Sequence, residues 1–240
     1  MKSHSLAAAL AFLIAGSAHA AMNTLYSDDY DGNEFVATGV SVSGLANGNL
    51  EDAVTNGGWS GKYFANRTAG NPAGMSFLTL GNLTEHTQVS VSFLLGFLES
   101  WDGFDAGEWG PDNLDIYIDG SRVARLTATN ALGSADEFGG GTVLVYRGQI
   151  NGNPYYSDVL LDMSSAPYLT FAHTASTLTV GIQASGSGWQ GGDDEGWGVD
   201  SLKITYDGVP AVPEPSTWAM LGAGLAGLAV TSRRRRSPAR

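Results

Sequence analysis

The stretch Val89-Ser90-Val91-Ser92-Phe93 alternates apolar and polar residues without a break. Successive side chains of a β-strand point to opposite faces, so this pattern predicts a strand with one buried and one wet face. Further along the chain, Asp119-Gly120 joins two apolar stretches. It is a two-residue hairpin signal, because both positions can take a positive φ. Together the two features indicate an antiparallel β fold.

Along the chain, ten stretches rich in β-branched and aromatic residues are each bounded by Gly, Asn, Asp, Pro or Ser. They are 35–42, 75–80, 88–98, 114–118, 122–128, 142–146, 159–163, 168–172, 178–184 and 198–206. Away from the two ends of the chain no window shows a helical period, although 52–56 and 131–136 have room for one helical turn. About ten strands without an internal repeat favour an all-β, jelly-roll-like antiparallel β-sandwich over a propeller or solenoid.

The charge balance is strongly acidic once the two ends are set aside. The whole chain carries a net charge of −12, from 12 basic and 24 acidic residues. Lys2, Arg233 to Arg236 and Arg240 lie outside residues 22–215, which therefore hold six basic residues against 24 acidic ones, a net charge of −18. Such a surface repels nucleic-acid phosphates and attracts cations. Cysteine is absent, which excludes disulfides and thiolate chemistry.

The N-terminal segment has the order of a secretory signal. Lys2 supplies the positive region, residues 6–14 the apolar core and Ala18-His19-Ala20 the cleavage site. An uncleaved membrane helix is disfavoured, because the apolar core is too short. We therefore expect residues 1–21 to be a signal peptide.

The C-terminal segment has three parts: Pro213-Glu214-Pro215, an apolar run over 218–230, and four arginines, Arg233, Arg234, Arg235 and Arg236. The apolar run is shorter than the roughly 20 residues of a stable span. The arginine cluster at its end predicts the orientation of the segment: the arginines stay in the cytoplasm, and the preceding chain lies outside. A plain single-span anchor is the alternative, but it does not need Pro-Glu-Pro at its start.

This tail resembles the PEP-CTERM sorting signal. The resemblance implies recognition and processing by an exosortase, export through the inner membrane, membrane attachment through the tail before processing, and a final place at the cell surface or in extracellular matrix. It also implies an association with exopolysaccharide and biofilm systems. The expected organisation is a signal peptide over 1–21, a β-sandwich over 22–208, a Pro-rich linker with the Pro-Glu-Pro motif over 209–215, and a short transmembrane sorting helix with its arginine cluster over 216–240.

Two acidic, aromatic loops, 99–115 and 191–200, stand beside predicted strands. Ca²⁺ takes six to eight oxygen ligands in flexible geometry, which carboxylates and Gly-rich loop carbonyls can supply. Neither loop matches an EF-hand or a Gly-Gly-x-Gly-x-Asp repeat. The calcium prediction therefore rests on composition.

A looser resemblance covers residues 25–206. Ser100-Trp101-Asp102-Gly103, Gly110-Pro111-Asp112 and Asp194-Glu195-Gly196-Trp197-Gly198-Val199-Asp200 look like the loops of extracellular jelly-roll, carbohydrate-binding-like modules. The resemblance implies that the Ser-Trp-Asp loop and the last strand lie close together around a structural calcium. By this resemblance the first ligand candidates are Asp102, Asp112, Glu195 and Asp200, followed by Asp115 and Asp194. Ser201 stands where the family has Asn, which removes an amide contact. Simple solvation is the alternative for each single carboxylate.

Aromatic residues suggest a second kind of site. Trp109 and Trp189 are flanked by Gly in loops and are candidates for stacking on sugar rings. Trp197, at a strand entry, is expected in the core.

Catalytic motifs are missing from the sequence. Outside the signal peptide the histidines are His86 and His173, and there is no Gly-x-Ser-x-Gly elbow, His-Glu-x-x-His or Walker loop. A glycosidase needs two carboxylates, but nothing singles out a pair. We therefore expect a non-enzymatic, exported calcium-binding sandwich associated with matrix polysaccharide. The alternatives are a purely structural adhesin or matrix protein and, below it, a glycan-active hydrolase.

Overall fold

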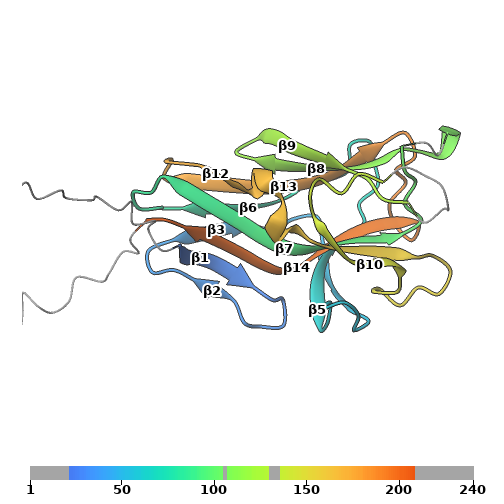
Figure 1. The fold of residues 1–240 in the computed structure, drawn as a ribbon, viewed down its shortest axis with the longest axis horizontal. Coiled ribbons are helices and arrows are strands. Elements are labelled where there is room, and N and C mark those ends of the chain that lie inside the picture. The colour runs from blue at the N-terminus through green and yellow to red at the C-terminus, as the bar shows by residue number, and fades with distance from the viewer. Residues whose placement is uncertain (1–21, 105–106, 130–135, 209–240) are drawn as a thin grey trace, which may run out of the picture.

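A computed structural model describes residues 22–104, 107–129 and 136–208. These residues form a sandwich of two antiparallel sheets (Figure 1). The predicted signal peptide, linker and sorting segment lie outside the described residues. Within the described part, no helix has the length and apolar character needed to cross a membrane.

The larger sheet has nine strands in the order β10-β11-β7-β14-β1-β2, with β12 beside β7, β5 beside β14 and β4 beside β5. Their bounds are β1 (Asn23–Asp28), β2 (Phe35–Val36), β4 (Asn49–Asp52), β5 (Lys62–Asn66), β7 (Gln88–Glu99), β10 (Thr142–Gly148), β11 (Asp158–Asp162), β12 (Thr170–Ala172) and β14 (Glu195–Tyr206). The two longest strands, β7 and β14, pair from Glu99 and Glu195 at one end to Val89 and Tyr206 at the other.

The smaller sheet has five strands in the order β3-β6-β13-β8-β9. They are β3 (Ser41–Gly44), β6 (Ser76–Gly81), β8 (Asp112–Ile118), β9 (Ser121–Leu126) and β13 (Thr177–Gly186). The chain passes between the sheets several times, for example from β7 to β8 and from β13 to β14. Three short 3₁₀ turns are described: η1 (Gly107–Trp109), η2 (Met163–Ser165) and η3 (Pro167–Leu169).

The alternation of β7 builds the core. Val89, Val91 and Phe93 are buried between the sheets, whereas Ser90 and Ser92 face outward. A second, smaller core lies on the outer face of the larger sheet. It contains Trp59, Tyr63, Leu98, Ile150 and Leu160, and the β4–β5 hairpin helps to cover it. Both faces of β7 are therefore buried near its end, which explains why the clean alternation stops after Phe93.

The predicted strands largely agree with the structure, with three corrections. The stretch 35–42 is two strands, β2 and β3, because a turn with Gly39 at φ 85° divides it. The stretch 52–56, which had room for one helical turn, forms none: Asp52 ends β4, and Asn56 forms a β-bridge with Trp59. Residues 131–135 of the other such stretch lie outside the described residues. The strands β1, β4 and β5 were missed. Polar residues make up most of β1 (NTLYSD) and β4 (NLED), and β5 (KYFAN) has a short apolar run instead of an alternation. The hairpin at Asp119-Gly120 is confirmed, with φ values of 48° and 76°.

Candidate functional site

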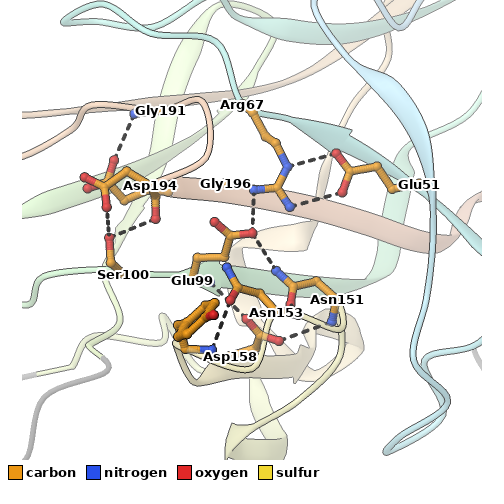
Figure 2. Close-up of polar contacts among 12 residues, drawn as sticks. Glu51, Arg67, Glu99, Ser100, Asn151, Asn153, Asp158, Gly191, Asp194 and Gly196 are labelled. Atoms are coloured by element: carbon orange, nitrogen blue, oxygen red, sulfur yellow. Dashed lines mark hydrogen bonds and ion pairs between the residues drawn. The ribbon is translucent and has the colours of Figure 1, made fainter.

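The two acidic loops meet at one end of the sandwich. Ser100 follows β7, and its backbone N–H donates to the carbonyl oxygen of Asp194 at 3.0 Å. Its hydroxyl donates to the same carbonyl and to Asp194 Oδ1, both at 2.8 Å (Figure 2). The indole Nε1 of Trp101 donates to the carbonyl of Gly196 at 2.6 Å. These contacts hold the Ser-Trp-Asp loop against the start of β14.

Four carboxylates gather where the loops meet. We call Asp102, Asp112, Asp194 and Glu195 the acidic cluster. Asp112 is fully buried, and its Oδ2 accepts a hydrogen bond from the backbone N–H of Asp102 at 2.8 Å. Glu195 is also buried, and its Oε2 accepts from the N–H groups of Gln190 and Gly191 at 2.9 and 2.8 Å.

Burial and mutual repulsion make ionisation of the cluster unfavourable. The pKa of Asp112 is raised to about 7, first by burial and then by the charges of Glu195, Asp102 and Asp194, against the lowering effect of its backbone hydrogen bond. The pKa of Glu195 is likewise raised to about 7, first by burial and then by Asp194 and Asp102, against the lowering effect of its two backbone hydrogen bonds. The pKa of Asp102 is raised by burial and then by Asp194. A proton or a cation would relieve this repulsion.

Asp112 carries the clearest sign of an unmet interaction. Its Oδ1 is buried and accepts no hydrogen bond in the described structure. Oxygen donors of this kind fit Ca²⁺. Among the described residues, however, no three His, Cys, Asp or Glu side chains are arranged to hold a metal ion. A cation held in this arrangement would therefore draw on fewer than three side-chain ligands and on other oxygens besides.

Asp115 does not join the acidic cluster, which corrects the predicted ligand set. It is three residues from Asp112 on β8 and therefore faces the opposite side of the sheet. Both of its oxygens are occupied. Arg125 donates to them from Nε and Nη2 at 2.8 and 2.7 Å, and Arg122 Nη1 lies 3.3 Å from Oδ2.

Asp200 is also separate from the cluster. Glu195 points to the inward face of β14 together with Trp197 and Val199. Asp200 directly follows Val199 and therefore points to the opposite face. Its Oδ1 accepts from the N–H of Ser201. Burial raises its pKa to about 6, and the charges of Asp31 and Asp29 add to the effect. The sequence reading missed this neighbouring loop, 28–34, although four of its seven residues are acidic.

The structure differs from the prediction in which tryptophans are exposed. Trp109 is 68% exposed and remains available for stacking. Trp189 is only 6% exposed, and its Nε1 donates to the carbonyl of Thr68 at 3.0 Å. Its predicted role as an exposed contact is therefore wrong. Its ring packs 5.3 Å from that of Trp101. Trp197 is in the core, as expected.

An arginine network beside the acidic loops was not anticipated (Figure 2). Arg67 donates to both oxygens of Glu51, from Nε at 2.8 Å and from Nη2 at 3.1 Å. Its Nη1 lies 3.0 Å from Glu99 Oε1. The guanidinium lies over Gly196, where a Cβ would come within 2.9 Å of Nη1. The network ties the β4–β5 hairpin to the end of β7 and leaves Glu99 paired with a cation.

Comparison with known proteins identifies only the tail. Residues 211–236 match the family described as the PEP-CTERM protein-sorting motif. No curated protein matches the chain. The matched region contains the predicted motif residues Pro213, Glu214, Pro215 and Arg233 to Arg236, which lie outside the described residues. The chain therefore carries a PEP-CTERM protein-sorting motif. It is an exported exosortase substrate, anchored in the membrane by its C-terminal segment before processing and placed at the surface afterwards.

Proposed function

We propose that the exported domain is a non-enzymatic binding module of the extracellular matrix that associates with polysaccharide and is stabilised by Ca²⁺ at the acidic cluster. The observation that carries the calcium part is the buried, unpaired Oδ1 of Asp112 among three other carboxylates. A buried carboxylate oxygen without a hydrogen-bond partner costs free energy, which a cation offsets. In an exported, strongly acidic domain whose candidate ligands are all oxygen atoms, Ca²⁺ is the fitting cation.

The geometry favours a binding module over a glycan hydrolase. The carboxyls of Asp112 and Glu195, whose pKa values are about 7, have the acidity that a general acid needs. However, Asp112 is 0% exposed and Glu195 is 1% exposed, so neither reaches a substrate in solution. His86 and His173 contact each other, with Nε2 and Nδ1 at 2.6 Å, and both rings are buried. Their burial supports the proposal that these groups have structural roles.

Thermal unfolding with added calcium tests the metal site. The metal-free exported chain is expected to gain several degrees in melting temperature with millimolar Ca²⁺ at pH 8, and less with equal Mg²⁺. Asp112→Asn should abolish the gain, whereas Asp200→Asn, on β14 outside the acidic cluster, should retain it. Equal melting curves with and without Ca²⁺ would refute the calcium site.

The matrix association needs a separate measurement. The exported protein is expected to co-sediment with extracted extracellular polysaccharide without releasing reducing sugar. Failure to co-sediment would favour a purely structural adhesin. Sugar release that disappears on replacement of a single carboxylate would favour the hydrolase.

A further inference from the structure

Two buried histidines contact each other through their rings, and we call His86 and His173 the histidine pair. His86 precedes β7, and His173 follows β12, where its backbone N–H donates to the carbonyl of Thr87 at 3.0 Å. Each of the two residues is 7% exposed. Nε2 of His86 lies 2.6 Å from Nδ1 of His173, and the two ring planes differ by 20°. The rings are therefore joined by a hydrogen bond, with one proton between the two nitrogens.

The partners of the two rings determine how many protons the histidine pair needs. Nδ1 of His86 lies 2.6 Å from the carbonyl oxygen of Thr84. A carbonyl only accepts, so this Nδ1 carries a proton. A second proton lies between the two rings. Two neutral imidazoles carry two protons in total, so a neutral pair leaves Nε2 of His173 bare.

Nε2 of His173 faces a carboxylate. This nitrogen is buried and has no hydrogen-bond partner in the described structure, and Asp119 Oδ2 lies 3.2 Å from it. A bare ring nitrogen and a carboxylate oxygen both present lone pairs, so they repel each other. A third proton, on Nε2, turns the contact into an ion pair. Burial disfavours the charged pair, whereas the net charge of −18 over residues 22–215 favours it.

The contact with Asp119 connects the two sheets. Asp119 lies in the turn between β8 and β9 of the smaller sheet, and its Oδ1 accepts from the backbone N–H of Thr179 on β13 at 2.8 Å. The histidine pair lies beside the pairing of β7 with β12 in the larger sheet. The ring of Tyr206 packs 5.7 Å from that of His86. The contact is therefore at the end of the sandwich where Asn23 lies opposite Tyr206 and the described chain begins and ends (Figure 1).

We propose that the histidine pair holds one proton more than two neutral rings carry, and that this third proton links the two sheets through Asp119 in a pH-dependent way. In mildly acidic medium the proton is present and the contact is attractive. It is released as the pH rises, because histidine changes charge between about pH 5 and 8. The contact then becomes repulsive, so the link between the sheets weakens with rising pH. An exported domain meets the pH of its surroundings, and the link responds to it.

The groups around the histidine pair allow this proton to exchange with water. A cleft of about 440 Å³ borders His86 and is also lined by Glu85, Thr87, Thr174, Asp207 and Gly208. Glu85 and Asp207 are the other ionisable groups of this cleft, and their negative charges favour the third proton. On the strands that pack against the rings, the titratable Tyr206 of β14 and Phe171 of β12 make edge-to-face contacts. The cleft gives water access to His86.

NMR of the imidazole nitrogens tests the proton count. His86 and His173 are the only histidines after residue 21, so the exported chain shows two ring systems. We expect three protonated ring nitrogens at pH 6 and two at pH 9. Any other count at pH 6 would overturn the proposal: two because the pair is then neutral, and four because the rings then cannot share a proton. A third proton that persists at pH 9 would refute the pH dependence.

Asp119→Asn removes the charge but keeps the turn. Asn tolerates the positive φ of 48°, forms the same kind of hairpin turn with Gly120, and offers an oxygen to the N–H of Thr179. The variant should therefore fold normally and show two protonated ring nitrogens at pH 6. Glu85→Gln is the control, because it removes an equal charge from the cleft that borders His86, and it should keep the third proton. Retention of that proton in Asp119→Asn, or its loss in Glu85→Gln, would show that Asp119 does not hold it.

Amide hydrogen exchange tests the link between the sheets. The amide of Thr179 donates to Asp119, so its protection factor reports on this contact. Between pH 6 and 9 the protection factor should fall by about tenfold more in the wild-type chain than in Asp119→Asn, because a charge-assisted contact is lost only in the former. The acidic cluster also loses protons over this range, but its effect is present in both chains and cancels in the comparison. An equal fall in both chains would show that the third proton does not link the sheets.

Discussion

Asp112 and Asp115 lie three residues apart on β8 and face opposite sides of its sheet. The first is a buried carboxylate with an unpaired oxygen, surrounded by other acids. The second is held by two arginines. One strand thus carries a carboxylate that other acids repel on one face and a carboxylate paired with arginines on the other.

The stability of the metal-free domain should fall as the pH rises from about 5 to 8. Asp112 and Glu195 have pKa values of about 7 when folded, against about 4 in an unfolded chain. The folded state therefore binds more protons. Its extra stability is full below the unfolded pKa and is lost as the pH rises through the folded pKa. The loss is on the order of a few kcal/mol, measured by denaturant unfolding. A flat profile, or one rising with pH, would contradict the shifted pKa values.

Replacing the two aspartates should change stability in opposite directions at pH 8. Asp112→Asn removes a buried, repelled charge and should stabilise the metal-free domain. Asp115→Asn leaves Arg125 without its carboxylate and should destabilise it by about 1–2 kcal/mol. Denaturant midpoints for the two variants make a matched pair, since each changes one carboxylate to an amide on the same strand. Destabilisation by Asp112→Asn as large as that by Asp115→Asn would argue against repulsion in the acidic cluster.

Gly186→Ala should destabilise the domain strongly. Gly186 has φ 130°, and a Cβ there would lie 2.0 Å from the carbonyl oxygen of Pro111, which is backbone and cannot move aside cheaply. Strain and clash together are expected to cost about 2–4 kcal/mol. Gly120→Ala is the control, because Gly120 also has a positive φ, 76°, but nothing within 4 Å. Its cost should be about 1 kcal/mol, from backbone strain alone. Equal midpoints for the two variants would show that the contact with Pro111 is not rigid.

Replacing the two candidate stacking residues, Trp189 and Trp109, should change the stability of the domain by very different amounts. Trp189→Ala empties a core position and should cost about 3–5 kcal/mol of stability. Trp109→Ala removes an exposed ring and should change stability by less than about 0.5 kcal/mol. Urea unfolding measures both. A loss of matrix binding by Trp109→Ala at unchanged stability would place that ring in the glycan contact. A large loss of stability would instead show that Trp109 is packed.

Much of the fold was readable from local pattern. The alternation at Val89–Phe93 and the Asp119-Gly120 hairpin predicted strands that the structure contains, because period and turn chemistry are local properties. The divided stretch 35–42 and the missed hairpin β4–β5 were different. The strand character of β5 depends on the second core around Trp59 and Tyr63, which only distant segments assemble. The stretch 35–42 is divided because its two ends pair in different sheets, β2 with β1 and β3 with β6.

The candidate site was only half readable. The density of Asp and Glu marked both loops, and the structure brings Asp102, Asp112, Asp194 and Glu195 together. The sequence could not show that Asp115 faces Arg125, because that contact depends on which face of β8 meets the core. Nor could it show that Arg67 crosses Gly196, since the two residues come together only through the pairing of β5 with β14.

The sequence by itself determined where the protein goes, that it is acidic and free of cysteine, and that it is built of antiparallel strands. A sorting motif is read as a linear string, and charge and strand period are sums or repeats along the chain. Only the tertiary structure decided which carboxylates share an environment, which tryptophan is exposed and where positive charge collects. These properties depend on sheet faces and on contacts between segments that are far apart in the sequence, such as Ser100 with Asp194, which are 94 residues apart.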